Sequence, residues 1–216
     1  MTMMKRTLFA VFFLPLLVSA CSVELPGSGE APRLFVLSPK SSFEPGLPKA
    51  DWQLLIDTPI TAAGLSSQRI ALNRNRLEME YFANAGWTDS LPNLVQRLMI
   101  ESFENSGKIV SVGRQAIGLR ANFIVNTDLR EFQAEYDPAN PTAPPVAHVK
   151  INAKLIKMPQ RRIVASHTFE HAVEAKSGKM EDIIRAFDLA LGKALKRIVG
   201  WTLTNGDDQI KQAAQG

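Results

Sequence analysis

The chain has 216 residues, of which 45% are hydrophobic and 21% charged, with 25 Lys and Arg against 21 Asp and Glu and one Cys. This composition is that of a globular domain and excludes disordered, collagen-like and multi-span membrane proteins. One Cys cannot form a disulfide framework. The net charge of +4 comes with no basic run and no aromatic-interleaved basic stripe, so the sequence argues against nucleic acid as a partner.

The first 20 residues have the layout of a secretory signal peptide. Lys5 and Arg6 precede an apolar run over residues 8–18, and small residues follow it. The run is shorter than the roughly 20 residues that cross a bilayer as a helix, so we expect cleavage and not a transmembrane anchor. Loss of this segment leaves 23 basic against 21 acidic residues, which makes the mature chain nearly neutral.

The segment Val18-Ser19-Ala20-Cys21 resembles a bacterial lipobox, in which the chain is cut between Ala20 and Cys21 and the Cys is lipidated. The alternative is a free thiol beside an ordinary cleavage site. More than one acyl chain, such as palmitate, anchors a protein stably to a membrane. Residue 22 is Ser and not the Asp that commonly retains such lipoproteins at the inner membrane. The resemblance therefore favours a lipid anchor in the outer membrane, with the domain facing the periplasm.

A tether is expected to follow the lipidated Cys, over residues 21–33. Residues 22–33 are small, polar and rich in Pro and Gly, a composition that orders poorly. Fully extended, these twelve residues reach at most roughly 40 Å.

The first half of the mature chain alternates between strand patterns and one helix pattern. Strands are predicted at residues 34–37, 52–56, 69–73, 77–81 and 109–112. The polar turn at residues 73–75 makes a hairpin of the third and fourth. Between the last two strands, Pro92 stands in the first turn of a predicted helix, and Gly107 ends it.

The second half predicts three long elements and a tail. The strand that starts at Phe123 changes its apolar phase between Leu129 and Phe132, which requires a β-bulge near Arg130. Residues 148–155 and 163–173 alternate as a hairpin. A long helix with an apolar stripe follows Ser177, and the polar residues 204–216 are predicted to be disordered.

This order of elements predicts an α+β fold for the domain at residues 34–203. Antiparallel hairpins with a helix after each group of strands indicate a mixed, largely antiparallel sheet with two main helices packed on one face.

Catalytic patterns are scarce in the sequence. It has no phosphate-binding loop, and its Gly27-Ser28-Gly29 lies in the tether. His167 and His171 would lie roughly 13 Å apart on one strand, too far to share a metal ion. We therefore expect no enzyme, no cofactor and no metal site. The alternative is a hydrolase of envelope lipid or glycan that uses Glu78, Glu80 or His167.

Three aromatic residues are candidates for a partner interface, because Trp and Tyr are enriched at such sites. They are Trp87, Tyr81 and Trp201. Packing in the core is the competing interpretation for the two tryptophans, and the sequence favours it.

Several segments resemble the family of ABC-type transport auxiliary lipoproteins, which includes the PqiC-type lipoproteins. They are the lipobox at Cys21, Leu34-Phe35-Val36-Leu37-Ser38-Pro39, Ser67-Gln68-Arg69-Ile70-Ala71, the stretch from Tyr81 to Trp87, Leu91-Pro92-Asn93-Leu94-Val95-Gln96, Glu104-Asn105-Ser106-Gly107 and the closing helix. The resemblance covers about residues 32–203. It departs at Gly86, where the family often has Arg before the Trp.

The resemblance implies an auxiliary component of an MCE-type lipid transport system. Its partners would be an MCE-domain protein and the permease and ATPase of the inner membrane, and it also allows a homo-oligomer. The family supplies no catalytic residues. The alternative in another class is an assembly lipoprotein for an outer-membrane barrel protein.

Overall fold

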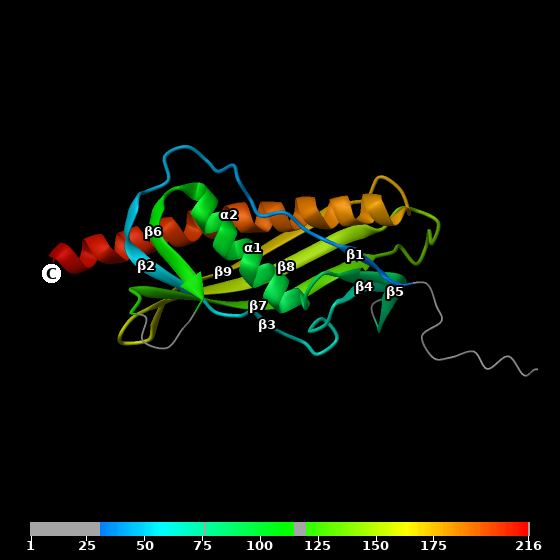
Figure 1. The fold of residues 1–216 in the computed structure, drawn as a ribbon, viewed down its shortest axis with the longest axis horizontal. Coiled ribbons are helices and arrows are strands. Elements are labelled where there is room, and N and C mark those ends of the chain that lie inside the picture. The colour runs from blue at the N-terminus through cyan, green and yellow to red at the C-terminus, as the bar shows by residue number, and fades with distance from the viewer. Residues whose placement is uncertain (1–30, 76, 115–119, 216) are drawn as a thin grey trace, which may run out of the picture. The chain divides into compact units, whose positions relative to one another are not determined.

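The computed structural model describes residues 31–75, 77–114 and 120–215, so the signal peptide, Cys21 and nearly all of the tether lie outside the described residues. Figure 1 shows the elements in chain order. They are β1 (Arg33–Phe35), β2 (Ala50–Ile56), β3 (Ile60–Thr61), β4 (Arg69–Asn75), β5 (Glu78–Trp87), α1 (Leu91–Ser106), β6 (Ile109–Arg114), β7 (Phe123–Glu135), β8 (Val146–Lys157), β9 (Arg162–Glu174) and α2 (Met180–Gln215).

Strand β7 is the centre of a single sheet that contains all the described strands. Along one edge it pairs with the antiparallel β8, which in turn pairs with β9. Along its other edge it pairs in succession with β2, β3 and β4, all parallel to it. Strands β5 and β1 extend the sheet beyond β4, and β6 extends it beyond β2. The longest pairings are antiparallel, which confirms the predicted α+β fold with a mixed, largely antiparallel sheet.

The predicted β-bulge in β7 is confirmed. Leu129 pairs with Ile151 and Glu131 pairs with Lys150, so Arg130 is the extra residue. The bulge lets Leu129 and Phe132 both point into the core, although they are three positions apart in a strand.

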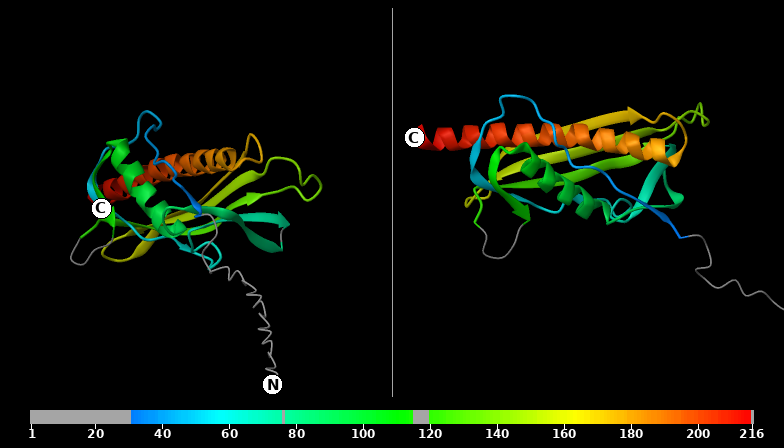
Figure 2. Two further views of the ribbon diagram at one scale, coloured as in Figure 1. Left: turned by 45° about the vertical axis from the view of Figure 1, so that its right-hand side comes forward. Right: turned by 45° about the horizontal axis from the view of Figure 1, so that its top comes forward.

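Both helices cover the same face of the sheet, as Figure 2 shows from two sides. Helix α1 begins after Ser90, whose carbonyl oxygen accepts from the amide of Leu94, and it ends at Gly107 in the left-handed conformation. Helix α2 lies over β8 and β9. Its Phe187 packs against Trp87 of β5 and Phe132 of β7, and the three ring centroids lie 5.2–5.9 Å apart.

The prediction of a disordered tail at residues 204–216 is wrong, because α2 continues to Gln215. Leu203 and Gly206 are buried, and Lys211 forms an ion pair with Asp207 one turn earlier. The polar composition misled the prediction because the contacts that hold the last turns are few, among them Ile210 against the core and Lys157 of β8 donating to the carbonyl of Gln209. The hairpin turn predicted at residues 73–75 lies later in the chain, because β4 extends to Asn75.

Gly206 fixes the last turns of α2 against β2. A Cβ at this position would lie 2.4 Å from Cζ2 of Trp52, whose ring packs edge-on against Phe123 with centroids 5.0 Å apart. A side chain here must displace the buried indole. The same addition at Gly200 meets only Leu47 at 3.5 Å, an ordinary contact.

We therefore expect opposite effects of two glycine substitutions in one helix. Gly206→Ala should lower the free energy of unfolding by about 1–3 kcal/mol through overpacking. Gly200→Ala should raise it by up to about 1 kcal/mol, because Ala loses less backbone entropy in a helix. Urea unfolding followed by circular dichroism measures both. Equal effects at the two sites would contradict the packing of Gly206 on Trp52.

Candidate functional site

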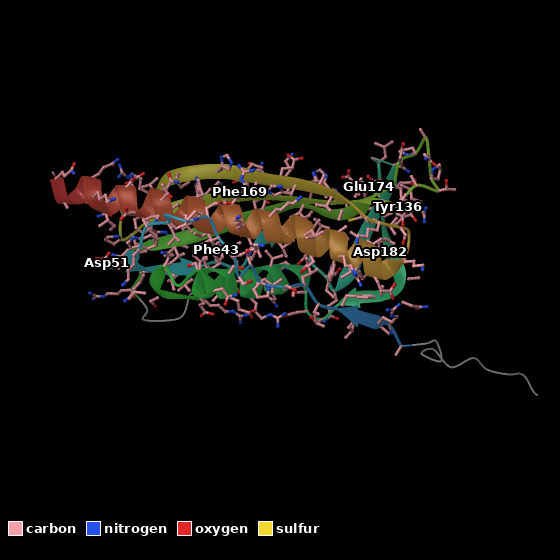
Figure 3. The ribbon with its side chains drawn as sticks, turned by 90° about the horizontal axis from the view of Figure 1, so that it is seen from above. Phe43, Asp51, Tyr136, Phe169, Glu174 and Asp182 are labelled. Carbon is pink, nitrogen blue, oxygen red and sulfur yellow. The ribbon has the colours of Figure 1, made fainter. Side chains whose placement is uncertain are left out.

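The face of the sheet away from the helices is polar. In β8 the side chains of Val149 and Ile151 are buried beneath the helices, whereas those of His148 and Lys150 alternate with them on the opposite face. In β7 the side chains also alternate between the two faces, with Phe132 in the core and Glu131 on the polar face. Tyr136 and Glu174 lie at the same end of the molecule as Asp182, in the first turn of α2 (Figure 3).

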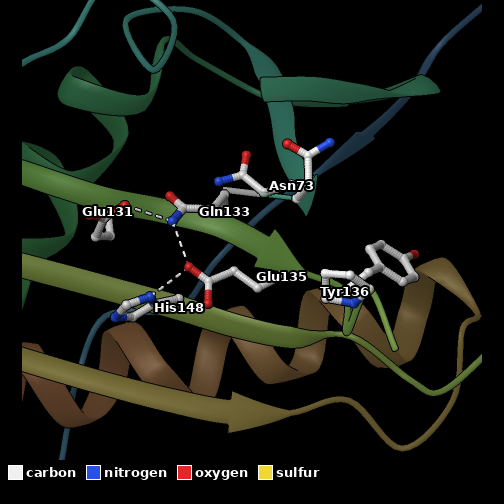
Figure 4. Close-up of a pocket in the computed structure, with 8 residues that line it drawn as sticks. Asn73, Glu131, Gln133, Glu135, Tyr136 and His148 are labelled. Atoms are coloured by element: carbon white, nitrogen blue, oxygen red, sulfur yellow. Dashed lines mark hydrogen bonds and ion pairs between the residues drawn. The ribbon is translucent and has the colours of Figure 1, made fainter. Parts of the chain in front are cut away.

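A cavity of about 500 Å³ opens on this polar face, between the ends of β4, β7 and β8 (Figure 4). Its lining is rich in amide and carboxylate groups. The lining residues are Asn73, Asn75, Glu131, Gln133, Glu135, Tyr136, Pro138 and His148.

Gln133 holds the two carboxylates of the cavity in place. Its Nε2 donates to Glu131 Oε2 at 2.6 Å and to Glu135 Oε1 at 2.9 Å, as Figure 4 shows. Its Oε1 accepts from the backbone amide of Phe132 at 2.8 Å, so this buried side chain is satisfied at both ends. The buried Oδ1 of Asn73 has no partner in the described structure. The carboxylates keep acceptor capacity on the side that faces the cavity.

His148 lies between two carboxylates from the neighbouring strands. Its Nδ1 lies 2.8 Å from Glu135 Oε1 and its Nε2 lies 2.8 Å from Glu170 Oε1. Only the doubly protonated ring can donate to both. Burial acts to lower the pKa of His148, but the hydrogen bonds and charges of Glu135 and Glu170 outweigh it and raise the pKa above its usual value.

Lys150 completes this charge cluster. Its Nζ lies 2.9 Å from Glu170 Oε2, and the hydrogen bond from Lys150, followed by that from His148, lowers the pKa of Glu170. Three carboxylates, the Gln133 amide, the His148 imidazole and the Lys150 ammonium thus form one connected array across β7, β8 and β9. Such an array fixes side chains in place and suits recognition of hydrogen-bond donors and cationic groups.

The predicted interface residues do not form one exposed surface. Trp87 is 1% exposed and belongs to the aromatic core, so it is not available on the surface for a partner. Tyr81 is half-buried, with the guanidinium of Arg69 3.5 Å from its ring centroid. Trp201 is half-buried against Phe169. A partner contact at Tyr81 or Trp201 stays a prediction. Ala20 and Cys21 lie outside the described residues.

The residues of the alternative hydrolase do not meet either. Glu78 accepts from the side chain of Asn75 at 2.9 Å, and Glu80 lies 3.7 Å from Arg74, both on the β4–β5 hairpin. His167 is an exposed residue of β9. No group of three His, Cys, Asp or Glu side chains among the residues described is arranged to hold a metal ion.

Local sequence patterns do not reveal the cluster around His148. His148 stands opposite Gln133 in β7 and Ala172 in β9, so its carboxylate partners lie diagonally across two strand pairs. Only the register of both pairs identifies them.

Solved structures share this architecture. A protein of Xanthomonas campestris from the DUF330 family is 28% identical and superimposes with a TM-score of 0.76, covering 83% of this chain and 99% of its own. An uncharacterised protein with 12% identity and a TM-score of 0.58 covers 75% of this chain and 97% of its own, and shows the fold alone.

The sequence comparisons supply the family. The chain belongs to the ABC-type transport auxiliary lipoprotein component family, whose sequence model matches residues 35–199. An uncharacterised protein of Bradyrhizobium diazoefficiens is 27% identical over 150 residues, which are 69% of this chain and 39% of that protein. The chain thus spans about two fifths of this relative. No helix within the described ranges is long and apolar enough to cross a membrane.

The raised pKa of His148 predicts a pH-dependent contribution to stability. A raised pKa stabilises the folded state at pH values below the unfolded pKa of about 6.5, and this contribution disappears as the pH rises through the folded pKa. His148→Gln should therefore lower the melting temperature more at pH 5.5 to 6 than at pH 9, because the contribution of the imidazolium declines as the pH rises.

Thermal unfolding across this pH range tests the effect, with His167→Gln on the other face of β9 as control. A destabilisation by His148→Gln that is the same at all pH values would show that the imidazolium does not bridge Glu135 and Glu170.

Proposed function

We propose that this protein is an outer-membrane-tethered periplasmic lipoprotein that serves an MCE-type, ABC-driven lipid transport system by docking the MCE conduit at the membrane. The match of residues 35–199 to the family of transport auxiliary lipoproteins carries the proposal. The lipobox that ends at Cys21 supplies the anchor. On this proposal the chain is a binding module and not an enzyme.

The size of the protein supports a docking role. A domain of about this length has a radius of gyration of roughly 16 Å, and the tether adds at most roughly 40 Å. Because α2 alone is roughly 54 Å long, domain and tether together reach on the order of 100 Å from the anchored Cys. A protein of this reach serves a conduit that comes to it, because it cannot itself bridge the two membranes of the envelope.

The polar sheet face is the surface we assign to the conduit. Its charged side chains, including Glu131, Glu135 and Lys150, are held by hydrogen bonds and ion pairs before any partner arrives. Pre-ordered side chains lose little entropy on association. Opposite charges that are placed in a fixed pattern also select the partner and its orientation.

A pull-down of tagged full-length protein from its native membranes in mild detergent tests the assignment. MCE-domain and permease subunits should be recovered with the native chain. Cys21→Ala should lose most of this recovery, because an unanchored protein is no longer concentrated at the membrane. Recovery of a barrel protein alone would overturn the proposal in favour of the assembly lipoprotein, and recovery of neither would also contradict it.

Charge reversal on the polar face tests the docking surface separately. Glu131→Lys combined with Glu135→Lys should reduce recovery of the MCE-domain protein by about tenfold, equivalent to about 1.4 kcal/mol. The matched control is Glu104→Lys, an exposed position on α1. Quantitative mass spectrometry of the pull-down measures both variants, and circular dichroism checks their folding. Equal recovery with both variants would remove the polar face as the docking surface.

A further inference from the structure

The tip of the β4–β5 hairpin exposes two apolar side chains. Leu77, at the turn, is 94% exposed, and Met79, two residues further on, is 42% exposed with its sulfur lying against Gly64. Leu77 has the highest exposed fraction among the exposed large apolar residues of the described ranges. A leucine held at the end of a projecting hairpin has no folding role at that place.

The polar groups beside the tip are already paired. Asn75 donates to the carboxylate of Glu78 at 2.9 Å, and its Oδ1 accepts from the amide of Leu77 at 2.9 Å. Arg74 lies 3.7 Å from Glu80 and 4.9 Å from the ring centroid of Tyr136. In sequence, Arg74 and Arg76 balance Glu78 and Glu80, so the hairpin end is formally neutral. Net charge therefore gives the tip no preference between an anionic and a neutral surface.

The tip lies within reach of a surface to which Cys21 is anchored. Strand β1 runs parallel to β5, and its first residue, Arg33, pairs with Ala85. Between Tyr81 and Gly86 strand β5 is irregular, because these two residues pair with Ala71 and Arg69, only two positions apart in β4. Ala85 lies seven positions after Glu78, so the two are at most roughly 23 Å apart. The eleven residues between Cys21 and β1 can span more than that, up to roughly 40 Å.

We infer that the β4–β5 hairpin tip inserts Leu77 and Met79 into the lipid surface to which the chain is anchored. The inference rests on lipid attachment at Cys21, which is part of the proposed function. The tip enters the boundary between headgroups and acyl chains, about 5–10 Å deep, where short apolar elements bind. Because the hairpin end is neutral, insertion needs neither anionic lipid nor low salt.

A fluorescent label at the tip tests the inference on the full, lipidated protein. Lipidation occupies the single native thiol, Cys21, so Leu77→Cys accepts an environment-sensitive dye selectively. The labelled protein is reconstituted into phosphatidylcholine vesicles, with and without phosphatidylglycerol. The matched control is Val110→Cys, an apolar position in β6 that is 69% exposed.

The dye at position 77 should shift its emission to shorter wavelength and be quenched by nitroxide-labelled lipid, equally in both lipid mixtures and at high salt. The dye at position 110 should stay accessible to a water-soluble quencher. Identical, water-like behaviour at both positions overturns the inference. So does protection of position 77 that needs added membrane proteins, since the tip would then contact a protein.

The vesicles hold no transport proteins, so this experiment is independent of MCE docking. The mass of the N-terminal peptide establishes beforehand whether Cys21 is lipidated. An unmodified Cys21 overturns both the anchor and the insertion. A lipidated Cys21 with a water-exposed position 77 overturns the insertion alone.

Discussion

The β-bulge at Arg130 keeps the apolar side chains of both halves of β7 on the face of the sheet that the helices cover. Strand β7 pairs with β8 over its whole length and with β2, β3 and β4 in turn along its other edge. Without the bulge, one half of β7 would turn its apolar residues away from the helices. The bulge keeps Leu129 and Phe132 on one side, and it thereby leaves Glu131 and Gln133 on the polar face that holds the cavity.

The sheet has two parts that are joined only through β7: β8 and β9 on one edge, and the remaining strands on the other. Helix α2 contacts both parts. It covers β8 and β9, with Trp201 against Phe169 of β9, and Phe187 stacks on Phe132 at the centre of the core. Its last turns then rest on Trp52 of β2, which belongs to the other part. One long helix thus ties elements that the strand pairings alone connect only through β7. This contact explains why α2 extends beyond its apolar stripe into polar sequence.

Local patterns predicted the elements well, whereas contacts between distant segments stayed hidden. Alternation identified the β8–β9 hairpin, and the change of phase before Phe132 identified the bulge. The last turns of α2 were missed because residues 204–216 are mostly polar, and the packing of Gly206 on Trp52, more than 150 residues earlier, cannot be seen in that local composition. The contacts of His148 with Glu135 and Glu170 depend on the register of three strands, which one sequence does not encode locally.

The polar cavity and the apolar tip belong to the same hairpin, which connects recognition with the membrane. Asn73 and Asn75 line the cavity, and Leu77 follows two residues later. A flexible tether concentrates the domain near the membrane but leaves it free to turn, so the polar face would point in every direction. A second, weak contact with lipid at the tip costs little further entropy, because the tether has already confined the domain. It would hold the mouth of the cavity near the lipid surface, where a conduit that delivers or removes lipid must arrive.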